Sequence, residues 1–274
     1  MTMKKFIFPL LAVLSVPAFA AQNLELDNLT KSDLEKVANE FAVNFSHTAV
    51  AAPETDGLWG VEVGVIGGAT GSPKLKKVVD ATGGDGKDFK SLYHAGLMAR
   101  VHMPFDIFAE ASLLPERKIS EVEVKARSFA LGWNAGAFFG LPLDLAVGAN
   151  ISSSDITFEQ TINNSSTSNT NVDSEISLDS KTRVLWVGAS KTFLFVTPYV
   201  KVGNAHTESK VKVDTNGGGG TIFAFTNKQK EDVSTNGGFL VAGLNLQLAF
   251  FKLGFEIGQT NTVRRASGKI SLDF

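Results

Sequence analysis

Apolar side chains occupy every second position through much of the C-terminal stretch 238–274. Successive residues of a β-strand point to opposite faces of a sheet, so a period of two predicts strands with one continuously apolar face. Because the sequence stops inside this pattern at Phe274, we expect a closed sheet whose last strand pairs with its first. The apolar series is Leu240, Ala242, Leu244, Leu246, Leu248 and Phe250, then Leu253, Phe255 and Ile257, and finally Ile270, Leu272 and Phe274.

The same alternation extends back to Leu58 and predicts about ten strands, within a range of about eight to twelve. Seven of them fall near 58–67, 90–102, 105–114, 121–138, 142–159, 176–192 and 195–213, and the last three lie in the C-terminal stretch, broken near 261–266. We therefore predict an all-β fold. It is a transmembrane antiparallel up-and-down β-barrel over 58–274, preceded by a short N-terminal amphipathic helix.

The predicted connections alternate between short and long. Very short turns lie at Met103-Pro104, Phe139-Gly140-Leu141, Phe193-Leu194 and Phe250-Phe251, whereas the polar loops 67–90, 160–174 and 214–237 are long. Short periplasmic turns and long extracellular loops are typical of outer-membrane barrels.

The two faces of the predicted strands differ in a way that favours a membrane barrel. One face is apolar over roughly nine to eleven residues, the length that a strand needs to cross a bilayer. The other has isolated charges of both signs, which would be costly in hydrocarbon but can pair across a lumen. We therefore expect the apolar face to contact lipid. A soluble ligand-binding barrel of about eight to ten strands, or a soluble sandwich, is the alternative fold.

The N-terminus has the pattern of a secretory signal peptide. Lys4 and Lys5 precede the apolar run 6–16, and Ala18-Phe19-Ala20 gives a small-x-small cleavage site before Ala21. The apolar run is too short to span a bilayer as a helix. The sequence thus predicts a signal peptide over 1–20, with a retained anchor helix as the alternative.

Residues 21–57 form a separate helical segment in this prediction. Ser32 and Glu35 fit a capping box, and an apolar stripe follows at spacings of three and four. At about 1.5 Å per residue the helix would be about 20 Å long, close to the barrel height. The segment is therefore predicted to plug the lumen or to cover the periplasmic mouth as a lid. The stripe includes Leu34, Val37, Phe41 and Phe45.

Together the signal peptide, the ten strands, the absence of cysteine and the terminal phenylalanine resemble Gram-negative outer-membrane β-barrel proteins. The resemblance implies export to the outer membrane. Residues 270–274 are similar to the aromatic-ended signal that the barrel-assembly machinery reads in that family, with Gly268 one position from the family's usual glycine, so the resemblance implies this machinery as a partner through Phe274. The N-terminal segment also resembles the hatch of FadL-type hydrophobic-solute channels, which have more strands. Neither resemblance assigns catalytic residues.

The mixed face should line the lumen and supply the ligand-contacting residues. It is rich in glycine, which marks places where another group approaches the backbone closely or where a strongly curved barrel relieves strain. The predicted lumen-lining residues are Glu62, His94, Met98, Arg100, Phe108, Glu110, Asn134, Trp186, Lys201, Phe239, Asn245 and Glu256.

Several kinds of chemistry are disfavoured. The net charge of -2 and the lack of a basic cluster argue against nucleic acid as a partner. Without cysteine there is no disulfide, thiolate metal site or thiol nucleophile, and we predict no metal and no cofactor. His94, expected near Glu62, and His206, at the outer rim, are the histidines that an enzyme could use, but no Ser/His/Asp spacing stands out.

We therefore expect a non-enzymatic outer-membrane barrel that contacts outer-membrane lipid. Its predicted role is a narrow or plugged channel, or a binding barrel, for a small solute that can be hydrophobic. One alternative is a structural or adhesive barrel acting through the loops 160–174 and 214–237. Another is a lipid-modifying acyl hydrolase of the outer membrane.

Overall fold

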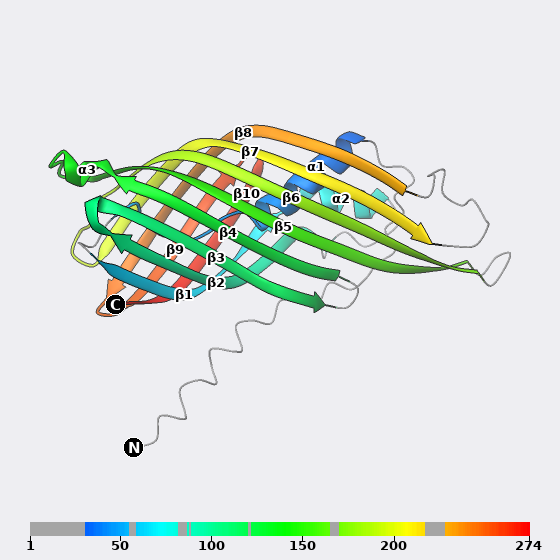
Figure 1. Cartoon of the computed structure of the whole chain (residues 1–274), viewed down its shortest axis with the longest axis horizontal. Helices are drawn as coiled ribbons and strands as arrows, with labels where there is room; N and C mark the ends of the chain where they lie inside the picture. The colour runs from blue at the N-terminus through cyan, green and yellow to red at the C-terminus, as the bar shows by residue number, and fades with distance from the viewer. Residues whose placement is uncertain are drawn as a thin grey trace, which may run out of the picture.

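The chain closes into a ten-stranded antiparallel barrel in the computed structural model, which describes residues 31–54, 59–81, 87, 89–119, 122–164, 170–216 and 228–274 (Figure 1). Each strand pairs with its neighbours in sequence, and β1 pairs with β10 to close the seam. The predicted fold class is thus confirmed. The predicted signal peptide and its cleavage site lie outside the described residues. The strands are β1 Gly60–Gly71, β2 Ser91–Met103, β3 Ile107–Ile119, β4 Val122–Asn134, β5 Asp144–Asn164, β6 Thr170–Ser190, β7 Val196–Asn216, β8 Lys228–Leu248, β9 Phe251–Thr260 and β10 Val263–Asp273.

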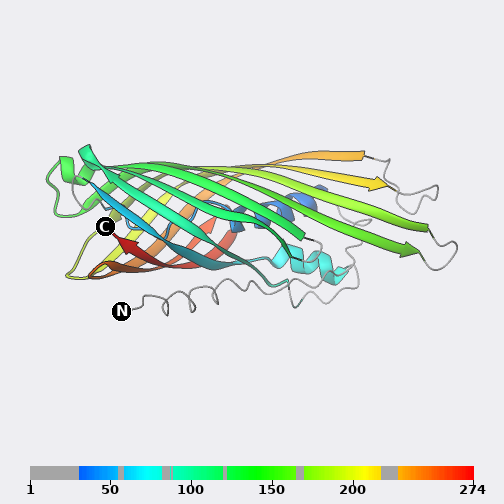
Figure 2. The ribbon, with the colours of Figure 1, turned by 60° about the horizontal axis from the view of Figure 1, so that its bottom comes forward.

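The strands are tilted and staggered (Figure 2). The stagger can be counted by starting at Val196 on β7 and moving from each residue to its pairing partner on the next strand. After one turn around the barrel this path returns to β7 at Glu208, twelve residues further along the strand. With a rise of about 3.3 Å per residue and a strand spacing of about 4.8 Å, this stagger corresponds to a tilt of about 40°. That tilt is typical of outer-membrane barrels.

Apolar side chains cover the outside of the barrel, and charged side chains lie inside. Leu185 and Ile257 point outward and are 69% and 67% exposed, whereas Arg100 and Glu62 point inward and are 2% and 1% exposed. A soluble barrel would have the opposite arrangement, because apolar surface is driven out of water. The chain is therefore an outer-membrane β-barrel protein of the Gram-negative type.

The helices are α1 Lys31–Asn44, α2 Pro73–Ala81, the 3-10 turn η2 Pro104–Asp106 and α3 Ala135–Phe138. Among the described residues, none of these helices is long and apolar enough to cross a membrane.

Two strand boundaries differ from the prediction. The fourth strand ends at Asn134 and not at 138, because the Asn134 side chain accepts a hydrogen bond from Gly136 N (3.0 Å) and starts helix α3. The last strand begins at Val263, and the predicted break over 261–266 is only a tight turn at Asn261, which has a φ of 56°. Arg264, Arg265 and Ala266 therefore belong to β10.

Two of the predicted long loops contain regular structure among the described residues. Helix α2 lies within the predicted loop 67–90, where Leu75 and Val78 are buried on one helix face. The predicted loop 160–174 is largely strand, because the β5–β6 ladder continues to Asn164 and Thr170. Strands β5 to β8 are each 21 residues long, well beyond what a bilayer requires.

Candidate functional site

Residues 31–54, which we call the lumen segment, run through the inside of the barrel (Figures 1 and 2). Asn39 on α1 accepts a hydrogen bond (2.8 Å) from Asn261, in the turn between β9 and β10 on the long-loop side. At the other end, Glu54 accepts one (3.2 Å) from Thr192, in the short turn between β6 and β7. The lumen segment therefore crosses the barrel from its extracellular end to its periplasmic end.

The apolar stripe of α1 packs near the extracellular end. Phe41 meets Phe158 of β5 edge to face, with ring centroids 5.8 Å apart, and Phe45 packs in the same cluster. Val37 packs against Leu75 of α2, whereas the Leu34 side chain lies outside the described residues. Aromatic pairs of this geometry stabilise beyond the area that they bury. The stripe thus joins the lumen segment to the wall and to α2.

Glu40 fixes helix α2 over the lumen segment. Its carboxylate accepts hydrogen bonds from the backbone amides of Lys74 and Leu75, both at 2.8 Å. These amides lie in the first turn of α2, where they have no partner within the helix and where a negative charge is favourable.

Arg265 of β10 binds the C-terminal end of α1. Its guanidinium donates to the carbonyl oxygens of Val43, Ser46 and His47 at 3.2 Å each, and to the Ser46 hydroxyl at 2.8 Å. Glu256 of β9 lies 3.7 Å from the same guanidinium. The last carbonyls of a helix lack intrahelical donors, so a buried cation satisfies both their hydrogen bonds and their partial charge. The sequence analysis missed Arg265, because it placed this residue in a loop.

Arg100 of β2 binds the lumen segment nearer the periplasm. It donates to the carbonyl oxygens of Ala52 and Glu54, both at 2.7 Å, and stacks over the Phe108 ring at 4.3 Å. Its guanidinium also lies 3.3 Å from the Glu110 carboxylate on the neighbouring strand.

Further polar contacts lie between these two arginines. His47 lies 3.0 Å from the Glu110 carboxylate and 2.8 Å from the Ser128 hydroxyl. Asn44 lies 3.1 Å from the His94 ring and donates to the carbonyl of Tyr93 at 3.3 Å. In the amide orientation that satisfies both partners, the side chain of Asn245 binds Val50 O and Ala52 N at 3.0 Å each. The wall thus holds the backbone of residues 43–54 along most of its length.

The remaining predicted lumen residues also point inward and are buried, and the polar ones contact mainly the wall. Glu62 accepts from Lys269 and Ser271 at 2.5 Å each, and Glu256 accepts from Tyr199 at 3.0 Å. Trp186 donates to Asn150 at 2.7 Å, and the Lys201 ammonium lies 4.9 Å from the Trp186 ring. Met98 packs with residues 49–51, and Phe108 and Phe239 cluster with Ala52.

One predicted placement was wrong. His94 lies opposite Gly68, whereas Glu62 lies opposite Arg100, so His94 and Glu62 are not neighbours. Asn134 is buried at the periplasmic end of β4, where it donates to Asp144 at 2.6 Å and braces the turn that follows.

The glycines of the inner face make room for close neighbours. A Cβ atom at Gly148 would lie 2.4 Å from the Trp186 ring, so this glycine lets the indole lie flat on the wall. A Cβ atom at Gly254 would lie 2.8 Å from the carbonyl oxygen of Val50 in the lumen segment. The lumen segment therefore approaches the backbone of the wall directly at Gly254.

A small cavity of about 30 Å³ lies between the lumen segment and the wall. Asn44 and Ser46 line it on one side, and Gly96 and Leu114 on the other. The volume has room for about one or two water molecules. Pairing between β2 and β3 stops at Leu97 and Leu113, beside this cavity.

The two histidines considered for catalysis have different surroundings. His94 contacts Asn44 and Ser267, and His206 contacts Asn236 and Glu208 on the outer face. Within the described ranges, no three His, Asp or Glu side chains are grouped so that they could hold a metal ion.

Residues 79–264 match a sequence family described as "Family of unknown function (DUF6588)". The chain belongs to this family. No curated protein matches this member of DUF6588 in sequence.

Solved structures similar to this DUF6588 member are outer-membrane barrels. Ail of Yersinia pestis, in complex with the heparin analogue sucrose octasulfate, is 12% identical, with a TM-score of 0.34 and coverage of 79% of this chain and 97% of its own. The translocator domain of autotransporter NalP from Neisseria meningitidis is 12% identical, with a TM-score of 0.43 and coverage of 80% and 90%. The Pseudomonas putida toluene transporter TodX is 8% identical, with a TM-score of 0.26 and coverage of 87% and 96%.

Proposed function

We propose that this chain is a non-enzymatic outer-membrane barrel that acts as a plugged channel or binding barrel for a small solute, with residues 31–54 as the plug. The observation that supports this most is the position of the lumen segment, which crosses the barrel and is held by Arg265 and Arg100 at successive levels. A barrel filled by its own chain conducts only when that chain moves.

The anchors suit a segment that can be displaced. They include hydrogen bonds from wall side chains to backbone carbonyls at Val43, Ser46, His47 and Ala52. Each charge-assisted hydrogen bond contributes only about 1.5–3 kcal/mol net, because water can replace either partner once the lumen opens. Displacement therefore breaks several moderate contacts and leaves the wall ladder intact.

The apolar part of the lumen favours a hydrophobic solute. Residues 49–51 pack against Ile66 and Met98, and Ala52 packs against a cluster that includes Phe108, Trp186 and Phe239. When the lumen segment moves, these apolar side chains lose their partners, and a small apolar molecule can replace them.

The lumen also contains a Ser–His–Glu arrangement, which we propose is an anchor and not a catalytic site. Ser128, His47 and Glu110 are joined by contacts of 2.8 and 3.0 Å. Glu110, however, is shared with Arg100. The neighbouring cavity of about 30 Å³ is too small for an ester substrate, and opening the lumen would remove His47. A Ser128→Ala variant should therefore leave any background hydrolysis of lipid A and phospholipid unchanged.

Single-channel conductance in a planar bilayer tests the proposal. The wild type should be closed or of low conductance, and deletion of residues 22–52 should raise the conductance several-fold. The cysteine-free chain also allows a lock, in which Asn39→Cys and Asn261→Cys are joined by a short bifunctional thiol reagent. The lock should abolish residual openings, and each single cysteine treated alike is its control. A deletion variant that folds and conducts like the wild type would rule out the plug.

A further inference from the structure

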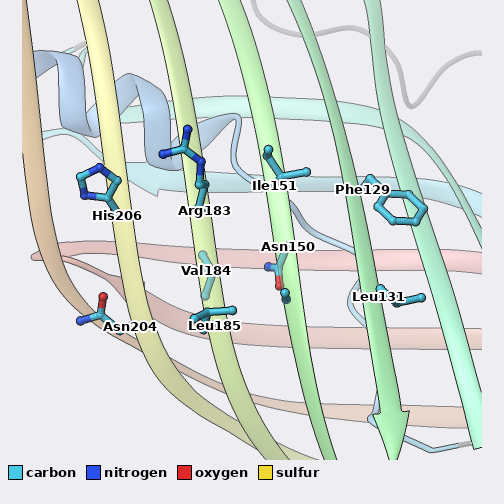
Figure 3. Close-up of a pocket in the computed structure, with 10 residues that line it drawn as sticks. Phe129, Leu131, Asn150, Ile151, Arg183, Val184, Leu185, Asn204 and His206 are labelled. Atoms are coloured by element: carbon cyan, nitrogen blue, oxygen red, sulfur yellow. The ribbon is translucent and has the colours of Figure 1, made fainter.

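A long furrow runs along the outer, lipid-facing wall across β4 to β7. Its extracellular part has a volume of about 500 Å³ and is lined by Phe129, Leu131 and Leu185 (Figure 3). The small residue Ala149 lies between Leu131 and Leu185 in the strand register. A second hollow of about 600 Å³ continues from it, since Ala149 and Leu185 line both. Val147, Val187 and Val202 line this second hollow, which lies nearer the periplasm. The furrow is therefore mainly apolar along its length, with Asn204 as the outward polar side chain below its basic end.

The furrow ends at a cluster of basic side chains. Arg183 of β6 and His206 of β7 are directly opposite one another at its outer end, above Leu185 and Asn204 (Figure 3). The next row of the same face toward the extracellular end adds two more basic residues, Arg127 on β4 and Lys181 on β6.

The basic cluster has an excess of positive charge. Two rows of paired residues across β4 to β7 form this end of the furrow, the row of Arg183 and His206 and the row of Arg127 and Lys181. Glu208 is the one carboxylate in these two rows, and it accepts a hydrogen bond from Arg183 at 3.1 Å. Arg127 and Lys181 make no ion pair with the described residues. These side chains lie where the outward apolar side chains end, at the extracellular edge of the lipid-facing band. That is the level of the headgroups in the outer leaflet.

We propose that the furrow binds one acyl chain of a phosphorylated, multiply acylated glycolipid of the outer leaflet, with Arg127, Lys181 and Arg183 holding its phosphate. The arginine fork matches phosphate geometry, and charge-assisted hydrogen bonds of this kind are among the strong ones. A lipid with more than one phosphate matches the charge excess better than a phospholipid with one. The site is on the outside of the wall and does not depend on the plug.

Native mass spectrometry of the full-length protein tests this proposal. The protein is exchanged into a lipid-free detergent, and purified bisphosphorylated lipid A, its dephosphorylated form or phosphatidylglycerol is added at equal concentration. We expect the wild type to retain the bisphosphorylated form about tenfold more than either of the others. The triple variant R127A/K181A/R183A and the furrow-filling variant A149F should each lose this preference. Arg264→Ala, which removes an exposed arginine of β10, is the matched control and should retain it.

Other results would overturn the proposal. Equal retention of the three lipids by the wild type would show that lipids bind the outer wall without specificity. This comparison uses the wild type alone, so it does not depend on the folding of any variant. Full retention by the triple variant, with normal heat-modifiable migration on a gel, would exclude the basic cluster. A dimer that A149F dissociates would assign the furrow to a second copy of the chain.

Discussion

Arg265 on β10 donates a hydrogen bond to the carbonyl oxygen of Val43 at the end of α1, 3.2 Å away and 222 positions earlier in the chain. The same guanidinium also binds the buried carbonyl oxygens of Ser46 and His47 in the lumen segment. One wall side chain thus adds donors and a positive charge where the helix ends and its last carbonyls lack helical partners. Arg265 therefore contacts the lumen segment at three backbone carbonyls, at Val43, Ser46 and His47.

Replacement of Arg265 by alanine should release the lumen segment while the barrel stays closed. The substitution removes the guanidinium donor from the His47 carbonyl, whereas the Val43 and Ser46 carbonyls each keep another donor. It also removes the cation next to Glu256, and breaking a buried pair of this kind costs about 3–5 kcal/mol. We expect faster hydrogen exchange at the amides of 43–54 and unchanged exchange in the β9–β10 ladder. Arg264→Ala, on the outward face of the same strand, is the control and should behave like the wild type. Equal protection of 43–54 in both variants would contradict the assigned role of Arg265.

The period-two alternation predicted the strand number, the closure and the inward charges, because burial in lipid imposes that pattern on every spanning strand. Arg265 was missed because the polar run 261–266 looks like a loop, whereas a two-residue turn at Asn261 keeps it in the ladder. The path of residues 46–54 was also not predictable. Side chains from distant strands hold its backbone there, and such contacts leave no local periodicity.

Substitution of Gly254 by alanine should displace the lumen segment from the wall. The new methyl group would lie 2.8 Å from Val50 O, too close for an ordinary contact. Overpacking of this kind costs about 1–3 kcal/mol, and we expect it as a lower midpoint of thermal unfolding and as weaker amide protection near Val50. Gly67→Ala is the matched control, because its methyl group would meet its nearest neighbour at 3.6 Å. Identical effects of the two variants would show that the curvature of the strand, and not the approach of the lumen segment, requires glycine at position 254.

The direction of the lumen segment predicts which of its ends the outside medium can reach. Lys36 on α1 is exposed near the extracellular end, where Glu40 of the same helix binds the first turn of α2. Lys191 is exposed at the periplasmic turn between β6 and β7. Because the native chain has no cysteine, Lys36→Cys and Lys191→Cys each introduce one unique thiol.

In intact cells, a membrane-impermeant maleimide that is too large for porins should label the cysteine at position 36 and not the one at position 191. After the outer membrane is permeabilised, both cysteines should react, which confirms that each variant is folded into the membrane and accessible. The expected pattern follows because the segment enters the barrel from the side of the long loops and leaves it at the short turns. Labelling at position 191 alone in intact cells would show that the barrel has the opposite orientation in the membrane. Labelling at neither position before permeabilisation would mean that loops close the extracellular mouth over α1.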